Sequence, residues 1–134
     1  TGEGLVRSIQ GAFKESGIQA SLIDYISAHG TATLYNDEME AIAFSRSHID
    51  TVAINSLKGY YGHTLGASGL LEIVIGLKSV YNEELLASKG FKNSGVSIPI
   101  AILKENRKKE IKYFLKTASG FGGCNTAVLF EKIN

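Results

Sequence analysis

Two histidines, a lysine and an acid are the residues of this 134-residue sequence whose types and spacing could do chemistry. His29 follows one short β-rich stretch, and Lys58 and His63 follow a second one. Ligands in α/β proteins bind in loops at the carboxyl ends of strands, so we expect these two loops to meet. Paired imidazoles can donate hydrogen bonds to an oxygen that gains negative charge, and one such donor is worth about 2.7–4 kcal/mol of barrier. The pattern therefore indicates enolate or oxyanion chemistry on a carbonyl compound.

The acid, Glu72, lies within residues 66–81, where apolar side chains fall on every side of a helical wheel. This pattern is typical of a helix that is enclosed on all sides. A carboxylate in such surroundings costs several kcal/mol unless it is paired or protonated, and we expect Lys58 to be its partner. Gly66 and Gly69 weaken a helix unless packing requires them, so close backbone approach is expected at its start. The Lys58–Glu72 pair is equally compatible with a structural role and with a role in a site.

Other groups with chemical potential have simpler explanations. A zinc site lacks a third ligand at a recognisable spacing. Gly120 to Gly123 can form a hairpin turn, because strand residues follow where a phosphate cradle requires a helix. Cys124 precedes apolar strand residues, and we expect a buried small hydrophobe there rather than a nucleophile. The basic run 104–112 is expected to be a solvated turn, with docking of an acidic partner as the alternative.

Composition narrows the class of protein. The chain is 44% hydrophobic and 20% charged, which is typical of a globular protein, and its length suits one domain or a large piece of one. A net charge of +1 argues against a general nucleic-acid or membrane-surface role. A lone cysteine excludes an internal disulfide and fits a reducing compartment. With no membrane-length apolar run and no signal pattern, we expect a cytoplasmic chain.

Helical and strand patterns alternate along the first 81 residues, and a β hairpin closes the chain. The predicted helices cover residues 5–17, 36–44 and 66–81. The predicted strands cover residues 23–28, 51–55, 96–103, 111–117 and 126–132. Pro99 in the third of these suggests an edge strand or irregular pairing. The pattern predicts an α/β fold in which helices pack on at least one face of a sheet.

Four motifs occur in a fixed order along the chain. They are HGTAT (29–33), Asn36-Asp37 with Glu40, LKGYYGHTLGASG (57–69) and SGFGGCN (119–125). In this order and spacing they resemble the C-terminal half of β-ketoacyl-acyl-carrier-protein synthases, the condensing enzymes of the thiolase superfamily. The resemblance implies the C-terminal half of a thiolase-like fold, with a mixed sheet, packed helices and a C-terminal β hairpin. Residues 1–134 would then be the C-terminal domain of a longer synthase.

The resemblance also implies roles for individual residues. The two active-site histidines of the family correspond to His29 and His63, and its lysine and buried acid correspond to Lys58 and Glu72. The family reaction is a decarboxylative Claisen condensation, in which a malonyl thioester loses carbon dioxide and the two histidines stabilise the enolate. The reaction needs no metal or dissociable cofactor, because its substrates are carried on phosphopantetheine.

Substrate contacts follow from the same resemblance. Thr31 and Thr33 match threonines that hydrogen-bond the pantetheine arm. Gly120 and Phe121 match a mobile gate loop, where the Phe121 N–H completes an oxyanion hole. Thr117-Ala118 stands where an asparagine is usual, and this departure affects the substrate pocket rather than the fold.

The family nucleophile is a cysteine in the N-terminal half, which this chain does not include, and Cys124 does not match it. We therefore expect the 134 residues by themselves to be inactive. The implied partners are acyl carrier protein and the N-terminal half, in a homodimeric or heterodimeric parent. The alternative is a non-catalytic partner subunit of the chain-length-factor type. A degradative thiolase fits less well, since thiolases typically supply a residue set other than the His29 and Lys58 loops.

Overall fold

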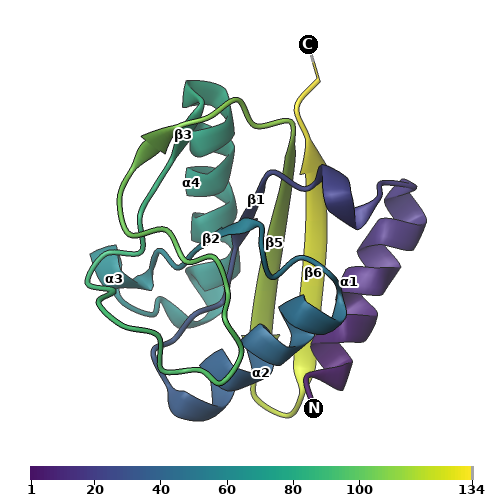
Figure 1. Ribbon diagram of the computed structural model, residues 1–134, viewed down its shortest axis with the longest axis vertical. Coiled ribbons are helices and arrows are strands. Elements are labelled where there is room, and N and C mark those ends of the chain that lie inside the picture. The colour runs from purple at the N-terminus through teal and green to yellow at the C-terminus, as the bar shows by residue number, and fades with distance from the viewer. Residues whose placement is uncertain (134) are drawn as a thin grey trace.

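A four-stranded mixed β-sheet organises the computed structural model, which describes residues 1–133 (Figure 1). Its strands are β1 (Tyr25–Ser27), β2 (Ala53–Asn55), β5 (Tyr113–Gly120) and β6 (Cys124–Glu131), in the spatial order β2-β1-β5-β6. β1 pairs in parallel with both β2 and β5, whereas β6 runs antiparallel to β5. The predicted α/β class with a mixed sheet is confirmed, and the carboxyl ends of β1, β2 and β5 lie at one edge.

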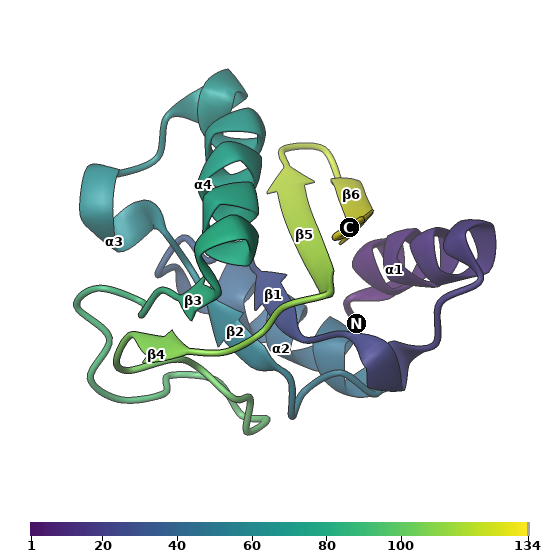
Figure 2. The same cartoon turned by 90° about the horizontal axis from the view of Figure 1, so that it is seen from above.

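Helices cover both faces of the sheet and make three layers (Figure 2). α1 (Glu3–Ser16) and α2 (Leu34–Arg46) lie on one face, and α4 (Ser68–Asn82) lies on the other. The short elements are η1 (Ala20–Leu22), α3 (Lys58–Tyr61), η2 (Leu65–Ala67), β3 (Glu84–Leu85) and β4 (Arg107–Lys108). β3 and β4 pair antiparallel in a second sheet. Between residues 1 and 133, no helix has the length and apolar character needed to cross a membrane.

Alternate residues of the central strands supply two separate apolar cores. Successive side chains of a strand point to opposite faces of the sheet. Ile26 and Leu115 therefore join the core beneath α1 and α2, while Tyr25 and Phe114 join the core beneath α4. The rings of Tyr25 and Phe114 stack with their centroids 5.1 Å apart. Because both faces are buried, the strands read as nearly continuous apolar runs.

The close approach of α4 to the sheet occurs at Gly76. A methyl group at this position would lie 2.3 Å from Cζ of Phe114, a distance that side chains do not tolerate. A methyl group at Gly66 or Gly69 would meet no non-neighbouring atom of the described chain within 4 Å. Within residues 1–133 the close approach expected at the first glycines of this helix is therefore absent, and the packing glycine lies about two to three turns further on.

The face of α4 opposite the sheet is exposed. Glu72, Gly76 and Val80 are buried. The opposite face carries four exposed apolar residues at helical spacing, Leu70, Val74, Leu77 and Tyr81, which we call the α4 stripe. Within the described chain only the side of the helix that faces the sheet is covered, because the wheel reports which side chains are apolar and not what covers them.

The predicted strand over residues 96–103 is not formed, but the irregular pairing that Pro99 suggests is present. This segment runs irregularly along the edge of β2, with one isolated parallel bridge between Ile54 and Ile102. Pro99 has no N–H to contribute to a ladder, which favours this irregular course. The segment therefore borders β2 without extending the sheet.

The hairpin that closes the chain is confirmed. β5 and β6 pair along their whole length, ending with Gly120 opposite Cys124. Gly122 and Gly123 both have a φ angle of 80°, a region that is open to glycine and strained for other residues. Cys124 is exposed, because it begins the edge strand β6 next to this turn. The expectation of a buried Cys124 is therefore wrong.

Candidate active site

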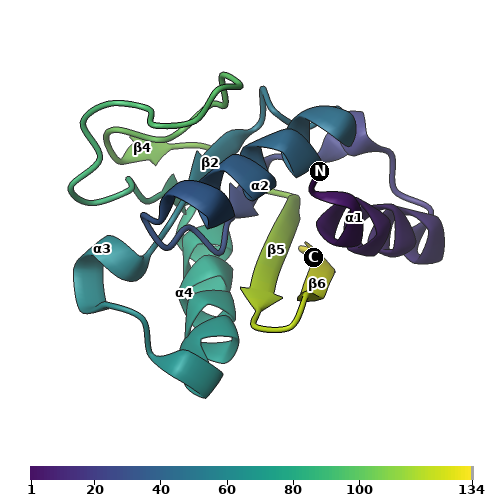
Figure 3. The same ribbon diagram turned by 90° about the horizontal axis from the view of Figure 1, so that it is seen from below.

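Two loops that carry site residues leave the same edge of the sheet. His29 lies two residues beyond β1, Lys58 lies three residues beyond β2, and His63 follows in the same loop. Ser27 pairs with Asn55 in the parallel ladder, so the two loops leave the sheet at the same level. Figure 3 views this side of the molecule and shows α3, the start of α2 and the β5–β6 turn around the edge. The two loops therefore meet, as their positions in the sequence predict.

The histidine rings are in direct contact. The centroids of His29 and His63 are 5.2 Å apart and the ring planes make an angle of 79°. Nδ1 of His63 accepts a hydrogen bond from the N–H of Leu65 at 3.0 Å. Nδ1 of His29 lies 3.3 Å from Nζ of Lys58, an ammonium group that can only donate. Since each Nδ1 is an acceptor, the proton of each neutral ring lies on Nε2.

A buried cluster of two lysines and one acid lies next to His29. Nζ of Lys58 is 2.6 Å from Oε1 of Glu72, and Nζ of Lys116 is 2.8 Å from Oε2. The side chain of Glu72 is fully buried, and those of Lys58 and Lys116 are 7% and 2% exposed. Lys58 also donates a hydrogen bond to the carbonyl oxygen of His29. The pair expected from the sequence is therefore present, together with a second lysine.

Burial and charge together set the protonation of this cluster. Burial by itself raises the pKa of Glu72, but the charges and hydrogen bonds of Lys116 and Lys58 hold this pKa below its usual value. Burial also lowers the pKa of His29, and the nearby Lys58, Lys116 and His63 lower it further, to about 4. At pH 7 Glu72 is therefore ionised and His29 is a neutral imidazole.

A second buried acid, Glu40 on α2, holds the backbone of the His29 loop. Its carboxylate accepts hydrogen bonds from the N–H groups of His29 and Gly30 at 2.8 and 2.7 Å. The side chains of Asn36 and Thr117 donate to the same carboxylate at 3.0 and 3.3 Å. Burial raises the pKa of Glu40 in spite of these hydrogen bonds. Glu40 thus fixes the direction in which the chain leaves β1.

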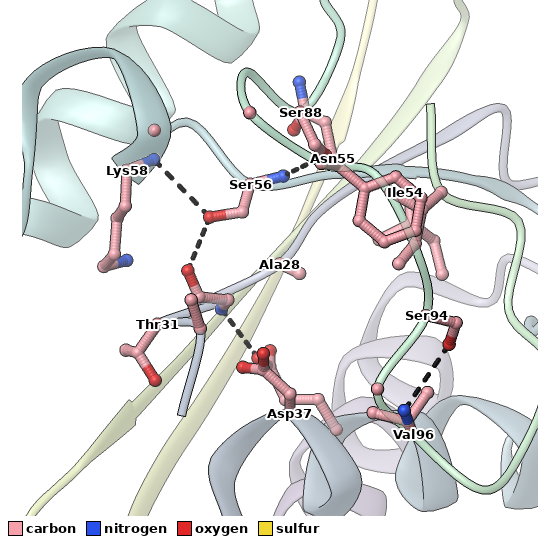
Figure 4. A pocket seen from close by; sticks show the side chains of 18 of the residues that line it. Ala28, Thr31, Asp37, Ile54, Asn55, Ser56, Lys58, Ser88, Ser94 and Val96 are labelled. Atoms are coloured by element: carbon pink, nitrogen blue, oxygen red, sulfur yellow. Dashed lines mark hydrogen bonds between the residues drawn. The ribbon is translucent and has the colours of Figure 1, made fainter. Parts of the chain in front are cut away.

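A groove of about 890 Å³ lies beside the histidine pair (Figure 4). It is bordered by α2 and by the irregular segment over residues 88–102. The candidate site residues that line it are Lys58, His63, Thr31 and Thr33. Figure 4 also shows Ser56, whose hydroxyl donates to the carbonyl oxygen of Gly30 at 2.6 Å and whose N–H donates to Oγ of Ser88 at 3.0 Å. Ser56 therefore joins three segments of the groove wall.

Two threonine hydroxyls are among the polar groups that line this groove. The Oγ1 atoms of Thr31 and Thr33 are 2.7 Å apart, so the two hydroxyls form one polar patch. Over residues 1–133, no three His, Cys, Asp or Glu side chains are grouped so that they could hold a metal ion.

Gly120 and Phe121 lie outside the groove. Gly120 ends β5, and Phe121 is fully exposed at the tip of the β5–β6 turn. Neither residue lines the groove. β5 runs parallel to β1, with Lys116 opposite Ser27, so the turn lies beyond the same edge of the sheet as His29. The match of these two residues to a gate loop stays a prediction.

Two residues that hold the site, Lys116 and Glu40, have no role assigned from the sequence. Lys116 is a single charge in the apolar strand YFLKTA, two residues after Phe114 and thus on the same face. A charge at such a position needs a buried partner, and this signal could have identified it. The hydrogen bonds of Glu40 to backbone N–H groups leave no comparable signal in the sequence.

The solved structures similar to this chain include β-ketoacyl synthases. The crystal structure of a β-ketoacyl synthase from Burkholderia phymatum STM815 matches with a TM-score of 0.95 and 29% identity, over 100% of this chain and 33% of the other. A chain from a structure of a type II polyketide-synthase acyl-carrier protein in complex with its ketosynthase matches with a TM-score of 0.88 and 27% identity, over 100% and 34% of the two chains. The thiolase-like fold predicted from the motifs is therefore confirmed.

Sequence comparison identifies the family. Residues 1–92 match the model of the β-ketoacyl synthase C-terminal domain, and the chain belongs to this family. The 3-oxoacyl-[acyl-carrier-protein] synthase 2 of Rhizobium meliloti (strain 1021) is 33% identical over 135 residues, covering 98% of this chain and 32% of the relative. The chain thus spans about a third of the length of the curated relatives that it matches.

Proposed function

We propose that this chain is the C-terminal part of a 3-oxoacyl-acyl-carrier-protein synthase of fatty-acid or polyketide synthesis. In the proposed reaction an acyl chain is held as a thioester on a cysteine. A malonyl thioester then loses carbon dioxide, and the resulting enolate attacks the acyl carbonyl and displaces the cysteine thiolate, giving a 3-oxoacyl thioester. The substrates are carried on phosphopantetheine, and no metal or dissociable cofactor takes part.

The histidine pair is the observation that supports this proposal most directly. The ring centroids of His29 and His63 are 5.2 Å apart, which allows one oxygen to lie at a hydrogen-bond distance of about 2.9 Å from both rings. Each ring carries its N–H on Nε2, because Lys58 donates to Nδ1 of His29 and the N–H of Leu65 donates to Nδ1 of His63. Donors held in this way stabilise an enolate oxygen without reorganisation as its negative charge develops.

The other site residues are assigned supporting roles. Lys58 and Glu72 hold His29 in place through the short ion pair and the bond from Lys58 to the His29 carbonyl. Thr31 and Thr33, which line the groove, bind the polar groups of a pantetheine arm. We assign Gly120 and Phe121 to a gate in which the Phe121 N–H completes an oxyanion hole for the acyl thioester.

In this proposal residues 1–134 form the C-terminal domain and the nucleophilic cysteine belongs to an N-terminal half. Cys124 lies at the start of β6 rather than at the head of a buried helix, so it does not fit that role. The exposed α4 stripe is an apolar surface that an N-terminal half would cover. Acyl carrier protein is the proposed substrate-bearing partner, and one structural neighbour is a ketosynthase in complex with such a protein.

A non-catalytic subunit that only shapes the chain-length pocket is the rival proposal. Such a subunit has no need for two histidines with free Nε2–H groups or for the buried lysine–glutamate pair. Since the chain has His29, His63, Lys58 and Glu72 in one connected cluster, we favour the enzyme.

The proposed function can be tested in a chimera in which these 134 residues replace the matching segment of the Rhizobium meliloti synthase. We expect the chimera to form 3-oxoacyl product and to release carbon dioxide from malonyl-acyl-carrier protein. His63→Ala should slow carbon dioxide release by about 10²–10³-fold, because one oxyanion donor is lost. The matched control is His48→Asn, which changes an exposed histidine beyond the end of α2. Equal rates for the chimera and its His63→Ala variant would refute the proposed role of the histidine pair.

A further inference from the structure

The proposed reaction leaves Lys116 without a role, although this side chain is 2% exposed and belongs to the buried cluster around Glu72. Burying an ammonium group costs several kcal/mol unless it is paired and hydrogen-bonded. Its partners are the Glu72 carboxylate at 2.8 Å and the carbonyl oxygens of Ser27, Ala28 and Thr117, at 3.2, 3.3 and 2.5 Å. Lys116 is therefore specifically bound, and its partners lie on both α4 and β1.

Three consecutive carbonyl groups, those of residues 27–29, are bound by ammonium groups. Lys116 binds the first two, and Lys58 binds the third. Both ammonium groups are also paired with the same carboxylate, that of Glu72. The segment that ends in His29 is therefore held to α4 by a single cluster with two positive charges and one negative charge.

The N–H side of the same segment is held from the opposite face of the sheet. Glu40 on α2 accepts the hydrogen bonds of the N–H groups of His29 and Gly30. The charged and titratable groups that face His29 are Lys58, Lys116, Glu72, His63 and Glu40. The backbone that leads into His29 is thus bound by ionisable side chains on both sides, and Lys116 supplies the contacts at Ser27 and Ala28.

We propose that Lys116 is a positioning residue for His29. Its ammonium group ties Glu72 to the carboxyl end of β1, which fixes the backbone from which the imidazole projects, and it makes the buried cluster net positive. The inference rests on the proposed function, in which His29 donates a hydrogen bond to the enolate oxygen. That step requires a neutral His29 and a stabilised negative charge on the enolate oxygen. A net positive cluster supports the first because it disfavours a second proton, on Nδ1 of His29, and it supports the second because it attracts the negative charge.

The test is a titration of His29 by NMR in the 134-residue chain. We expect the pKa of His29 to be about 4 in the wild type and to rise by about one unit or more in Lys116→Met, because a nearby positive charge is removed. Lys116→Arg keeps the charge and should hold the pKa near its wild-type value. The matched control is Lys112→Met, since the Lys112 side chain is 60% exposed and lies 3.7 Å from Glu131, away from His29. An unchanged pKa in folded Lys116→Met would overturn the inference.

A second comparison applies if Lys116→Met does not fold because the charge of Glu72 is left partly uncompensated. The pKa of His29 is then compared between Glu72→Gln and the double variant Glu72→Gln/Lys116→Met. We expect a higher pKa in the double variant, and equal values would overturn the inference. The titration requires no turnover. An inactive chimera therefore contradicts the proposed function, whereas an unchanged His29 titration contradicts the role of Lys116.

Discussion

At the scale of the residue, burial acts on the two central groups in different ways. Burial disfavours charge at both Glu72 and His29. At Glu72 the two lysines overcome this effect and keep the carboxylate ionised, whereas at His29 the same lysines add to it and keep the ring neutral. A single cluster therefore sets two protonation states, and both are needed if His29 is to act as a neutral hydrogen-bond donor.

We predict that the folded chain loses the stability contributed by His29 as the pH falls from about 6.5 to about 4. The folded pKa of His29 is about 4 and its ordinary value is 6.5, so in this window the unfolded chain binds a proton that the folded chain does not. The free energy of unfolding therefore rises with pH across the window. Each unit of difference between the folded and unfolded pKa of His29 contributes about 1.4 kcal/mol. Urea unfolding should show that the free energy of unfolding falls more between pH 7 and pH 4.5 in the wild type than in His29→Asn.

The comparison between variants isolates His29 from other titrating groups. Glu40, whose pKa is raised by burial, is present in both proteins, so its contribution is common to both. His48→Asn changes an exposed histidine and should keep the pH dependence of the wild type. If the pH dependence of His29→Asn matches that of the wild type, the neutral state of buried His29 is refuted.

At the scale of the element, the contact between α4 and β5 positions the buried cluster. Glu72 and Gly76 lie one helical turn apart on α4, and Phe114 and Lys116 lie two residues apart on one face of β5. The close contact of Gly76 with Phe114 therefore lies beside the ion pair of Glu72 with Lys116. Any change that separates the two elements at Gly76 also separates these charges.

We predict that Gly76→Ala destabilises the chain by about 1–3 kcal/mol, although alanine favours a helix more than glycine does. The added methyl group would lie 2.3 Å from Phe114 Cζ, so the helix or the ring must shift. The control is Gly69→Ala in the same helix, where the site is open and where we expect a gain of up to about 1 kcal/mol. Urea unfolding measures both, and changes of the same sign would contradict the packing role of Gly76.

At the scale of the whole molecule, the three-layer arrangement leaves α4 as an outer layer (Figure 2). The four residues of the α4 stripe are between 43% and 78% exposed. A continuous apolar face on one helix is typical of a surface that packs against another element. The sheet covers only one side of α4. The apolar residues on the other side of the helical wheel are therefore the exposed residues of the α4 stripe.

We predict that the isolated chain self-associates through the α4 stripe. The double variant Leu70→Lys/Val74→Lys should lower the mass measured by sedimentation at high protein concentration. It should change the free energy of unfolding by no more than about 0.5 kcal/mol, because both residues are more than half exposed. Leu34→Lys on α2, where the leucine is 68% exposed, is the control and should leave association unchanged. A wild-type chain that stays monomeric at all concentrations would refute the prediction.

Local patterns in the sequence predicted most of the elements and the meeting of the two site loops. The helix that became α1, the strands around Tyr25 and Ile54 and the closing hairpin follow from apolar periodicity and turn residues close together in the chain. The pairing of Lys58 with Glu72 was also predictable, because an acid in an apolar helix requires a cation and one lies just before that helix. These features depend on residues that are near one another in sequence.

Only the tertiary structure decided which surfaces and partners complete the site. The bond from Lys116 to Ser27 joins residues 89 positions apart, and the hydrogen bond from Thr117 to Glu40 spans 77 positions. The irregular path of residues 96–103, the exposure of Cys124 and the open face of α4 likewise depend on what lies beside each segment in space. Residue type determines what a side chain can bind, but the packing of distant segments determines which partner it meets.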